Sequence, residues 1–379
     1  MKSISLLLLA ASWASAMPKP EHSKGALYFL DSDPNGASVV SFGIARDGSL
    51  GEPVRTSTGG NGLIGNNANG SVTADPLFSQ GSVIVDGNLL FTVNAGSNTL
   101  AAFNIPENDP THPVLMGQPM DTAGTTPNTV AYSGKHKIAC VANTGTNPGV
   151  QCFSVSGSEG VKPVGGLRAL PILGQTNPVM GPANTVSNIV FNPSQTALFV
   201  VIKGDGMQNG YVYAYKIENG IVSEEAIISR PENLPIPFTM AFSDDNSALM
   251  ATPAYGAAFV SVSEDFRVTT ESVLNITTQM ATCWTARSSE TGSVYLLDAG
   301  RANINAVNTK AKAISRVLPG YEPGMGNFDG IISGSKLYVL EAAPAVAIFD
   351  LKDPSLGPKV VDLKGLGNRA SWIGMAAYA

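Results

Sequence analysis

Six side chains in this sequence have the chemistry to bind or transform a small polar molecule. An arginine offers a planar fork of N–H donors that matches a carboxylate, and a lysine adds a second cation. Two carboxyl groups can carry a proton in acid–base chemistry. An amide and an indole would complete a polar site with an aromatic wall. These candidates are Arg301, Lys203, Asp329, Glu341, Asn188 and Trp284.

Each candidate also has a simpler interpretation. Arg301 can form an ordinary surface ion pair, and Lys203 can pair with the nearby Asp205. Asp329 and Glu341 fall on adjacent predicted strands, so they can approach each other, but both can equally be solvated loop carboxylates. We therefore expect a ligand site only if the fold gathers these residues.

Histidine, the usual proton carrier near neutral pH, is scarce in this sequence. His22 lies near the N-terminus, His112 in a predicted loop and His136 in a predicted turn, away from the six candidates. We expect neither a histidine-based mechanism nor a histidine-bound metal. The sequence also contains no nucleotide-binding glycine motif, serine-hydrolase elbow or paired-cysteine motif, so we expect no cofactor.

The chain begins like a secreted protein. Lys2 precedes an apolar run and a small-x-small sequence at residues 14–16, which predicts a signal peptide over residues 1–16 and a short leader over 17–25. Asn69 and Asn275 head glycosylation sequons. We therefore expect a secreted glycoprotein, outside the cell or in a cell wall. The net charge of −6, with no basic cluster and no long apolar segment, argues against nucleic acid and a membrane span.

Two of the three cysteines flank a predicted hairpin turn. Counting outward from Thr146 places Cys140 opposite Cys152, at a separation that a disulfide can bridge. The secretory route permits such a bond. Cys283 is left over, and we interpret it as a small buried hydrophobic residue.

Short alternating strands separated by turn residues recur seven times. Equivalent positions return every 40 to 60 residues or so, the length of a four-stranded propeller blade with loop insertions. They are Tyr28, Phe91, Cys140, Phe199, Met250, Tyr295 and Tyr338. The sequence thus predicts one all-β domain over residues 26–379, a seven-bladed β-propeller that we expect to be a monomer.

The first repeat has no inner strand before it, whereas a spare inner-type strand lies at residues 371–376. We expect this strand to pair with residues 26–30 and close the ring, because closure removes exposed strand edges. The Gly- and Asn-rich stretch at 59–70 lies in the longest interval, and its composition predicts a mobile insertion.

The repeated strand-turn-strand pattern resembles the lactonase-type propellers, which include 6-phosphogluconolactonase-like proteins and fungal 3-carboxymuconate cyclases. The resemblance rests on FTVNAGSNTLAAFNI at 91–105 and LLDAGRANINAV at 296–307. VVIKGDG at 200–206 is similar to the secreted fungal branch of the family. The resemblance covers the whole mature chain and implies a site on the face where the inner strands begin.

The chain departs from that family where its enzymes carry a Gly-Pro-Arg-His-like run. Here the sequence is Gly181-Pro182-Ala183-Asn184, and Lys203 replaces a frequent glutamate. Arg301 keeps part of an Asn-Arg-Gly turn. This pattern predicts a binding protein, adhesin or antigen with an eroded lactonase-like site, whose partner is a small carboxylated molecule or an extracellular host or cell-wall component. The alternatives are a lactonase or 3-carboxymuconate-type cycloisomerase, and a carrier of a small apolar ligand.

Overall fold

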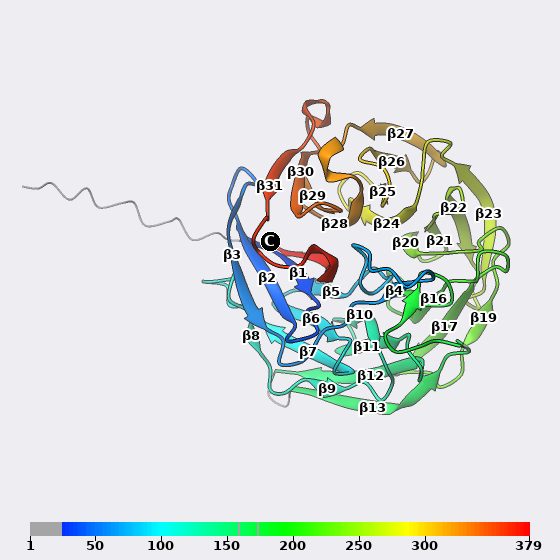
Figure 1. The fold of residues 1–379 in the computed structure, drawn as a ribbon. Helices are drawn as coiled ribbons and strands as arrows, with labels where there is room; N and C mark the ends of the chain where they lie inside the picture. The colour runs from blue at the N-terminus through cyan, green and yellow to red at the C-terminus, as the bar shows by residue number, and fades with distance from the viewer. Residues whose placement is uncertain (1–24, 158–159, 173) are drawn as a thin grey trace, which may run out of the picture.

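Seven small antiparallel sheets form a ring in the computed structural model, which describes residues 25–157, 160–172 and 174–379 (Figure 1). The predicted signal peptide lies outside the described residues. The expected seven-bladed β-propeller is confirmed. Within the described residues the only helices are three short 3-10 turns, η1 (Glu322–Gly324), η2 (Pro354–Leu356) and η3 (Arg369–Ser371), and no helix is long and apolar enough to cross a membrane.

The first four blades run from β1 to β19, with the last strand of the chain added to the first blade. Blade 1 contains β32 (Trp372–Tyr378), β1 (Gly25–Asp31), β2 (Ser38–Ile44) and β3 (Leu50–Ser57). Blade 2 contains β5 (Val83–Asp86), β6 (Leu89–Asn94), β7 (Thr99–Asn104), β8 (Val114–Leu115) and β9 (Met120–Asp121). Blade 3 contains β10 (Pro127–Ser133), β11 (Ile138–Asn143), β12 (Gly149–Ser156) and β13 (Gly160–Ala169), and blade 4 contains β15 (Val186–Phe191), β16 (Ala197–Ile202), β17 (Tyr211–Glu218), β18 (Ile221–Val222) and β19 (Ile227–Ser229).

The last three blades have four strands each. Blade 5 contains β20 (Thr239–Asp244), β21 (Ser247–Thr252), β22 (Gly256–Val262) and β23 (Val268–Asn275); blade 6 contains β24 (Thr282–Arg287), β25 (Ser293–Asp298), β26 (Ile304–Asn308) and β27 (Ala313–Leu318); blade 7 contains β28 (Asn327–Ser333), β29 (Lys336–Glu341), β30 (Ala345–Asp350) and β31 (Lys359–Asp362). A separate parallel pair joins β4 (Asn66–Asn67) to β14 (Met180–Gly181).

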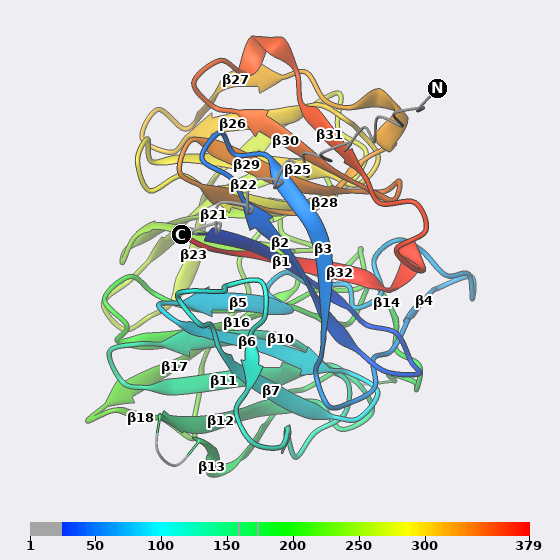
Figure 2. The ribbon, with the colours of Figure 1, turned by 90° about the vertical axis from the view of Figure 1, so that its left-hand side faces the viewer.

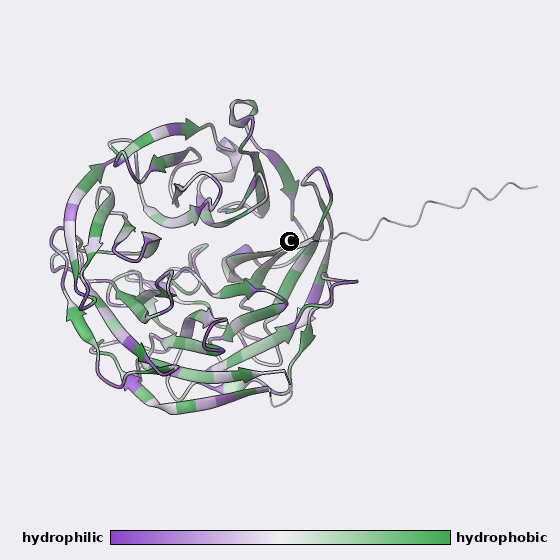
Figure 3. Cartoon of the chain, turned by 180° about the vertical axis from the view of Figure 1, so that it is seen from behind, coloured by the Kyte–Doolittle hydropathy of each residue, from purple (hydrophilic) through white to green (hydrophobic). Residues whose placement is uncertain are grey.

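The second and third strands of each blade are the most buried, which explains their apolar, β-branched and aromatic sequences. Figure 3 shows hydrophobic segments along the blades and many hydrophilic ones in the connecting loops. The core between the blades therefore repeats around the ring, and each blade buries its faces against its two neighbours.

The ring closes as the sequence predicted. Strand β32 pairs antiparallel with β1, with Tyr28 opposite Ala376 and Leu30 opposite Ile373. The predicted disulfide also forms: Cys140 and Cys152 are directly opposite in β11 and β12, with Cα atoms 4.1 Å apart. Cys283 is free and buried, as expected for a small core residue.

Besides β32, whose register with β1 shifts between Tyr28 and Leu30, four inner strands bulge near their first residues. In each, one residue has no partner in the register with the next strand, and its side chain is buried. The four residues are Asn128, Ser187, Cys283 and Asp329. An unpaired bulge residue bends its strand. The inner strands begin at the upper face of the ring, so these four residues form part of the buried lining of that face.

Candidate functional site

A single segment of the chain crosses the ring axis beneath the upper face. Residues 74–81, called the axial strap here, link the loop that carries β4 to the inner strand β5. Leu77 and Phe78 are fully buried in it. Figure 2 shows β4 and β14 on the same side of the ring as the start of β32. The strap therefore fills the upper part of the axis with the protein's own chain.

Donors from several parts of the ring hold the carbonyl oxygens of the axial strap. Asn128 Nδ2 donates to the Leu77 oxygen at 3.1 Å, Lys203 Nζ to the Phe78 oxygen at 2.5 Å, and Trp284 Nε1 to the Ser79 oxygen at 3.1 Å. Arg369 Nη1 donates to the Ala74 oxygen at 3.0 Å, and Thr129 Oγ1 to the Gln80 oxygen at 2.6 Å. Blades 3, 4 and 6 and the C-terminal turn therefore meet on one segment.

Gln80 also ties the strap across the axis. Its amide exchanges two hydrogen bonds with the backbone of Thr285 in blade 6, at 2.7 and 3.0 Å, in the manner of a neighbouring strand. Its own N–H donates to the Ser187 carbonyl of blade 4. Asn188, a predicted ligand residue, lies beside it, with Nδ2 3.4 Å from the Gln80 oxygen and Oδ1 accepting from Met240 N.

The Gly-Pro run quoted in the sequence comparison packs against the strap. A Cβ atom at Gly181 would lie 2.4 Å from the Phe78 ring, and one at Gly65 would lie 2.7 Å from it. Only glycine fits at such an approach. Part of the stretch from 59 to 70, expected as a mobile insertion, packs against the ring: Leu63 is buried and Asn66–Asn67 pairs with Met180–Gly181. Residues 68–70 at its tip are exposed.

Lys203 does not pair with Asp205, which faces solvent and accepts from its own turn. The lysine is buried, with Nζ 2.8 Å from Thr185 Oγ1 and 4.5 Å from the centre of the Phe238 ring. Burial lowers the pKa of Lys203 to about 7, against the attraction of Asp75. Burial likewise raises the pKa of Asp75 to about 7, against the attraction of Lys203 and Arg369. A proton at either group therefore depends on the other.

Asp329 and Glu341 are buried and are not solvated loop carboxylates. Burial raises the pKa of each to about 8; for Asp329 the nearby Asp75 adds to the effect, whereas Arg369 opposes it at Glu341. Both oxygens of Glu341 and Oδ2 of Asp329 have no hydrogen-bond partner among the described residues. Asp329 and Glu341 are thus two buried carboxyl groups with unused hydrogen-bonding capacity.

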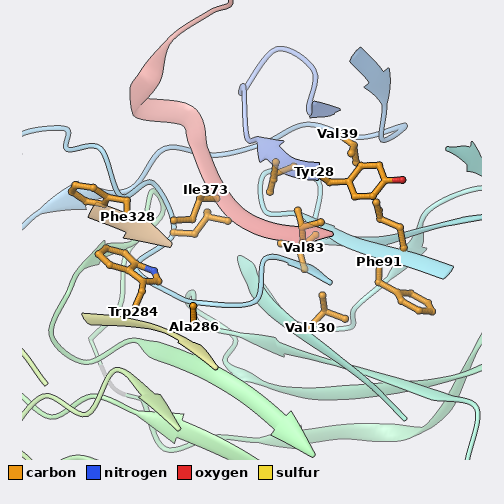
Figure 4. Close-up of a cluster of buried hydrophobic side chains, with 14 of the residues drawn as sticks. Tyr28, Val39, Val83, Phe91, Val130, Trp284, Ala286, Phe328 and Ile373 are labelled. Carbon is orange, nitrogen blue, oxygen red and sulfur yellow. The ribbon is translucent and has the colours of Figure 1, made fainter. Parts of the chain in front are cut away.

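Trp284, predicted as an aromatic wall of a ligand site, packs against other aromatic rings. Its ring centre lies 4.8 Å from that of Phe238 and 4.9 Å from that of Phe328. Figure 4 shows Trp284 and Phe328 close together, with Ile373 of β32 beside them. Trp372 packs on Phe29 at 5.3 Å. Trp284 therefore packs between neighbouring blades, whereas the contact between Trp372 and Phe29 lies within blade 1.

Arg301 stands apart from this buried group, in the turn between β25 and β26. It lines an open pocket of about 380 Å³ on blade 6, the Arg301 pocket, and its Nε donates to the Thr278 carbonyl at 2.9 Å. No ion pair joins Arg301 to a carboxylate in the described part of the chain. Asp298 shares the pocket, but its oxygens accept from Met280, Ala281, Thr282 and Gly300.

A second cavity of about 630 Å³ opens at the lower end of the channel. Inner-strand side chains such as Val85, Ile189 and Phe242 form its walls, and Gln80 of the strap lies at its closed end. The strap therefore divides the channel into a filled upper half and a hollow lower half.

The sequence grouped six candidates as one ligand site, whereas the structure buries five of them and leaves Arg301 apart on blade 6. Asp75, Asn128 and Arg369 were not predicted, although all three contact the strap or lie in it. Leu77-Phe78, two large apolar residues between two repeats, was the one signal of a buried segment. The sequon residues Asn69 and Asn275 are both exposed, so the structure leaves them accessible to a glycosyltransferase.

No metal-binding group of three or more histidine, cysteine or acidic side chains occurs in the portion of the chain that the structure covers. The side chains that donate to the strap include two cations, Lys203 and Arg369.

No protein-family model matches the sequence, and the search of curated proteins found no match. Among solved structures, a periplasmic gluconolactonase from Pseudomonas aeruginosa is 15% identical with a TM-score of 0.63, and 94% of this chain aligns with 99% of that chain. A protein of Bacteroides fragilis provisionally assigned as a 6-phosphogluconolactonase is 13% identical with a TM-score of 0.64, covering 96% of this chain and 100% of that one.

The likeness extends to a binding assembly. A chain of the nidogen–laminin complex is 10% identical with a TM-score of 0.50, covering 94% of this chain and 98% of that chain. Similar folds thus occur in a gluconolactonase and in a protein complex, so the comparisons do not select between catalysis and binding. What they establish is the fold: this chain has the seven-bladed architecture of the lactonase-like propellers.

Proposed function

We propose that this protein is an extracellular or cell-wall binding protein that takes a small carboxylated molecule in the Arg301 pocket. The observation that carries the proposal is the axial strap. The cation, amide and indole that would bind a substrate on the axis donate instead to the strap's own carbonyls. The Arg301 pocket remains open, with a guanidinium free of ion pairs among the described residues.

The chemistry of the pocket suits a carboxylate better than a reaction. Arg301 presents a fork that binds two carboxylate oxygens at once. Asp298, the adjacent acid, already accepts four hydrogen bonds from its own surroundings. The other wall residues include Thr278, Asn303 and Asn305, which offer hydroxyl and amide groups to a polar ligand.

The test is calorimetric titration with cis,cis-muconate, gluconate and citrate, comparing the wild type with Arg301→Ala and Arg301→Lys. We expect one of these acids to bind, Arg301→Lys to bind it more weakly and Arg301→Ala to lose at least about tenfold in affinity, since a bidentate charged contact is worth more than 1.4 kcal/mol. Equal affinity in all three proteins would refute the pocket assignment.

A lactonase or muconate-type cycloisomerase is the second candidate, and the fold shared with gluconolactonases favours it. It is tested by following sugar lactones and muconates by absorbance with the purified protein. Turnover that disappears in Arg301→Ala would replace the binding proposal with this one; no turnover above buffer would leave binding as the function.

A third candidate, a carrier of a small apolar molecule, is favoured by the 630 Å³ lower cavity, whose size is that of ordinary ligand pockets. Solvent extraction of the purified protein followed by mass spectrometry is the test, and a clean extract would count against it. Secretion and glycosylation belong to the same proposal and are checked by mass measurement of the exported protein, with and without glycosidase.

A further inference from the structure

The lower cavity is an open hollow whose walls are mostly apolar. The inner strands line it with apolar side chains that are only half-buried, namely Ile84, Val190, Ala241, Ile331 and Ala377. Figure 4 shows Val83, Val130 and Ala286, three more wall residues, which lie on strands of three different blades. Apolar surface of this kind favours a ligand that displaces water from it. The walls therefore match an apolar body.

The closed end of the cavity has few polar groups left to offer. Gln80 exchanges its two amide hydrogen bonds with the backbone of Thr285, at 2.7 and 3.0 Å. Asn188 accepts from Met240 N at 3.2 Å and lies 3.4 Å from the Gln80 carbonyl oxygen. These groups bind one another, so the innermost end of a ligand needs no hydrogen-bonding group.

The mouth of the cavity carries the opposite chemistry. Arg287 is the one charged side chain among the described residues that line the cavity, and it is exposed. Its Nη2 donates to the Ser243 carbonyl at 3.3 Å, and no ion pair joins it to an acid in the described ranges. Asp244 and Asp245, in the turn after β20, accept from backbone N–H groups instead, at 2.9 and 2.8 Å. The guanidinium is thus available to an anion at the mouth.

We infer that the lower cavity binds a medium-chain aliphatic carboxylic acid, with its chain directed toward Gln80 and its carboxylate at Arg287. The inference rests on the third candidate function, the apolar carrier, and adds that the carried molecule has an anionic head. A sugar would place hydroxyl groups against the apolar walls, whereas an alkane would leave the guanidinium unused. The site lies at the end of the channel opposite the face where the inner strands begin, and it is separate from the Arg301 pocket.

The experiment is calorimetric titration with decanoate, decanol and decyltrimethylammonium, each below its micelle concentration. Every protein carries Arg301→Ala, so that the Arg301 pocket cannot bind the carboxylate. We expect decanoate to bind more tightly than decanol, and at least about tenfold more tightly than decyltrimethylammonium, because the chain is the same and only the head differs. The affinity for decanoate should fall as salt is added, since salt screens an exposed charge pair.

Two substitutions separate the head from the chain. Arg287→Gln should weaken decanoate binding at least about fivefold and leave decanol unchanged, because only the charged contact is lost. Arg316→Gln, at an exposed arginine on β27, is the matched control and should bind like the parent. Ala241→Phe, which fills the cavity from its wall, should abolish binding of both decanoate and decanol. Its control is Ala311→Phe, in an exposed turn of blade 6.

Equal affinity for decanoate and decanol, or full decanoate affinity in Arg287→Gln, would overturn the anionic head and leave the apolar carrier standing. No binding of any of the three molecules would refute both this inference and the carrier. Should Ala241→Phe fail to fold, hydrogen exchange on the parent protein replaces it. Decanoate should then slow exchange at residues 83–86 and 286–288, and unchanged exchange would overturn the assignment. None of these outcomes bears on the Arg301 pocket, because that site is tested in proteins that retain Arg301.

Discussion

The ring axis and the Arg301 pocket contain similar side chains in opposite circumstances. On the axis, the Lys203 side chain is buried and donates to the Phe78 carbonyl. The Arg301 side chain is exposed and donates to one carbonyl, that of Thr278. The axial cation contributes to stability, because removing it would leave a buried carbonyl without its donor. The pocket cation contributes little and is available to a ligand. Residue type alone does not distinguish these two roles; the partner does.

The largest expected effect comes from preventing closure of the ring, which should abolish both regions. Deleting residues 370–379 removes β32, leaves β1 without its inner neighbour and detaches the turn that positions Arg369. We expect no folded soluble protein, since the backbone groups of β1 would lose their partners. Soluble yield and circular dichroism are the measurements, and deletion of the exposed Ala379 alone is the control. A truncated ring with wild-type melting temperature would contradict the closure model.

The next largest expected effect is the difference in stability cost between Phe78→Ala in the strap and a substitution in the Arg301 pocket. Removing a fully buried ring that packs on Gly181 and Gly65 should cost about 3–5 kcal/mol of unfolding free energy. In the Arg301 pocket, Met325→Ala truncates a side chain that is 74% exposed. This variant should change the unfolding free energy by less than about 0.5 kcal/mol. Denaturant unfolding of both variants gives the answer, and equal costs would mean that the strap is loosely held.

A pH titration sharpens the contrast between buried and exposed carboxyls. The pKa of Glu341 rises from 4.5 to about 8 in the folded protein, so the folded state binds a proton more tightly than the unfolded one. The stability from this group is therefore complete below pH 4.5 and is lost as pH rises toward 8. Lys203 is protonated in the unfolded state throughout this range, and its folded pKa of about 7 matters only near the upper end.

Between pH 5 and 7, Glu341→Gln should flatten the decline in unfolding free energy by up to about 1 kcal/mol per pH unit. Glu322→Gln, at an exposed carboxyl in the Arg301 pocket, is the control and should keep the wild-type slope. Parallel slopes for all three proteins would show that Glu341 is ionised in the folded state.

The smallest expected effect is on the cation of the pocket itself. Arg301→Met should change the unfolding free energy by less than about 0.5 kcal/mol, as is usual for a surface substitution. Lys203→Met should cost about 1–3 kcal/mol, because the Phe78 carbonyl would lose its Nζ donor. Thermal unfolding of the matched pair measures the difference, and a reversed order would exchange the roles assigned to the two regions.

The blades and the disulfide were predictable because their signals are local or periodic. Cys140 and Cys152 are placed opposite each other by a single turn, and β32 is identified as the strand that the first repeat lacks. These inferences need only strand alternation and the length of one blade.

The strap was not predictable in the same way. Residues 74–81 have no periodicity, and the Gly- and Asn-rich sequence before them is typical of a surface loop. Lys203 and Phe78 are 125 residues apart, and Trp284 and Ser79 are 205 apart. No local pattern records contacts over such distances, so the sequence offered a ligand or Asp205 as the partner of Lys203, and the Phe78 carbonyl was not foreseen.

The position of the strap in the chain has a consequence for biosynthesis. Residues 74–81 leave the ribosome before all the side chains that hold them, and Trp284 and Arg369 follow only near the end. Blade 1 likewise waits for the last residues, because β32 completes it. The nascent chain must therefore carry an exposed Leu77-Phe78 and an unfinished sheet until translation is nearly complete, which makes this ring a natural substrate for chaperones during its synthesis.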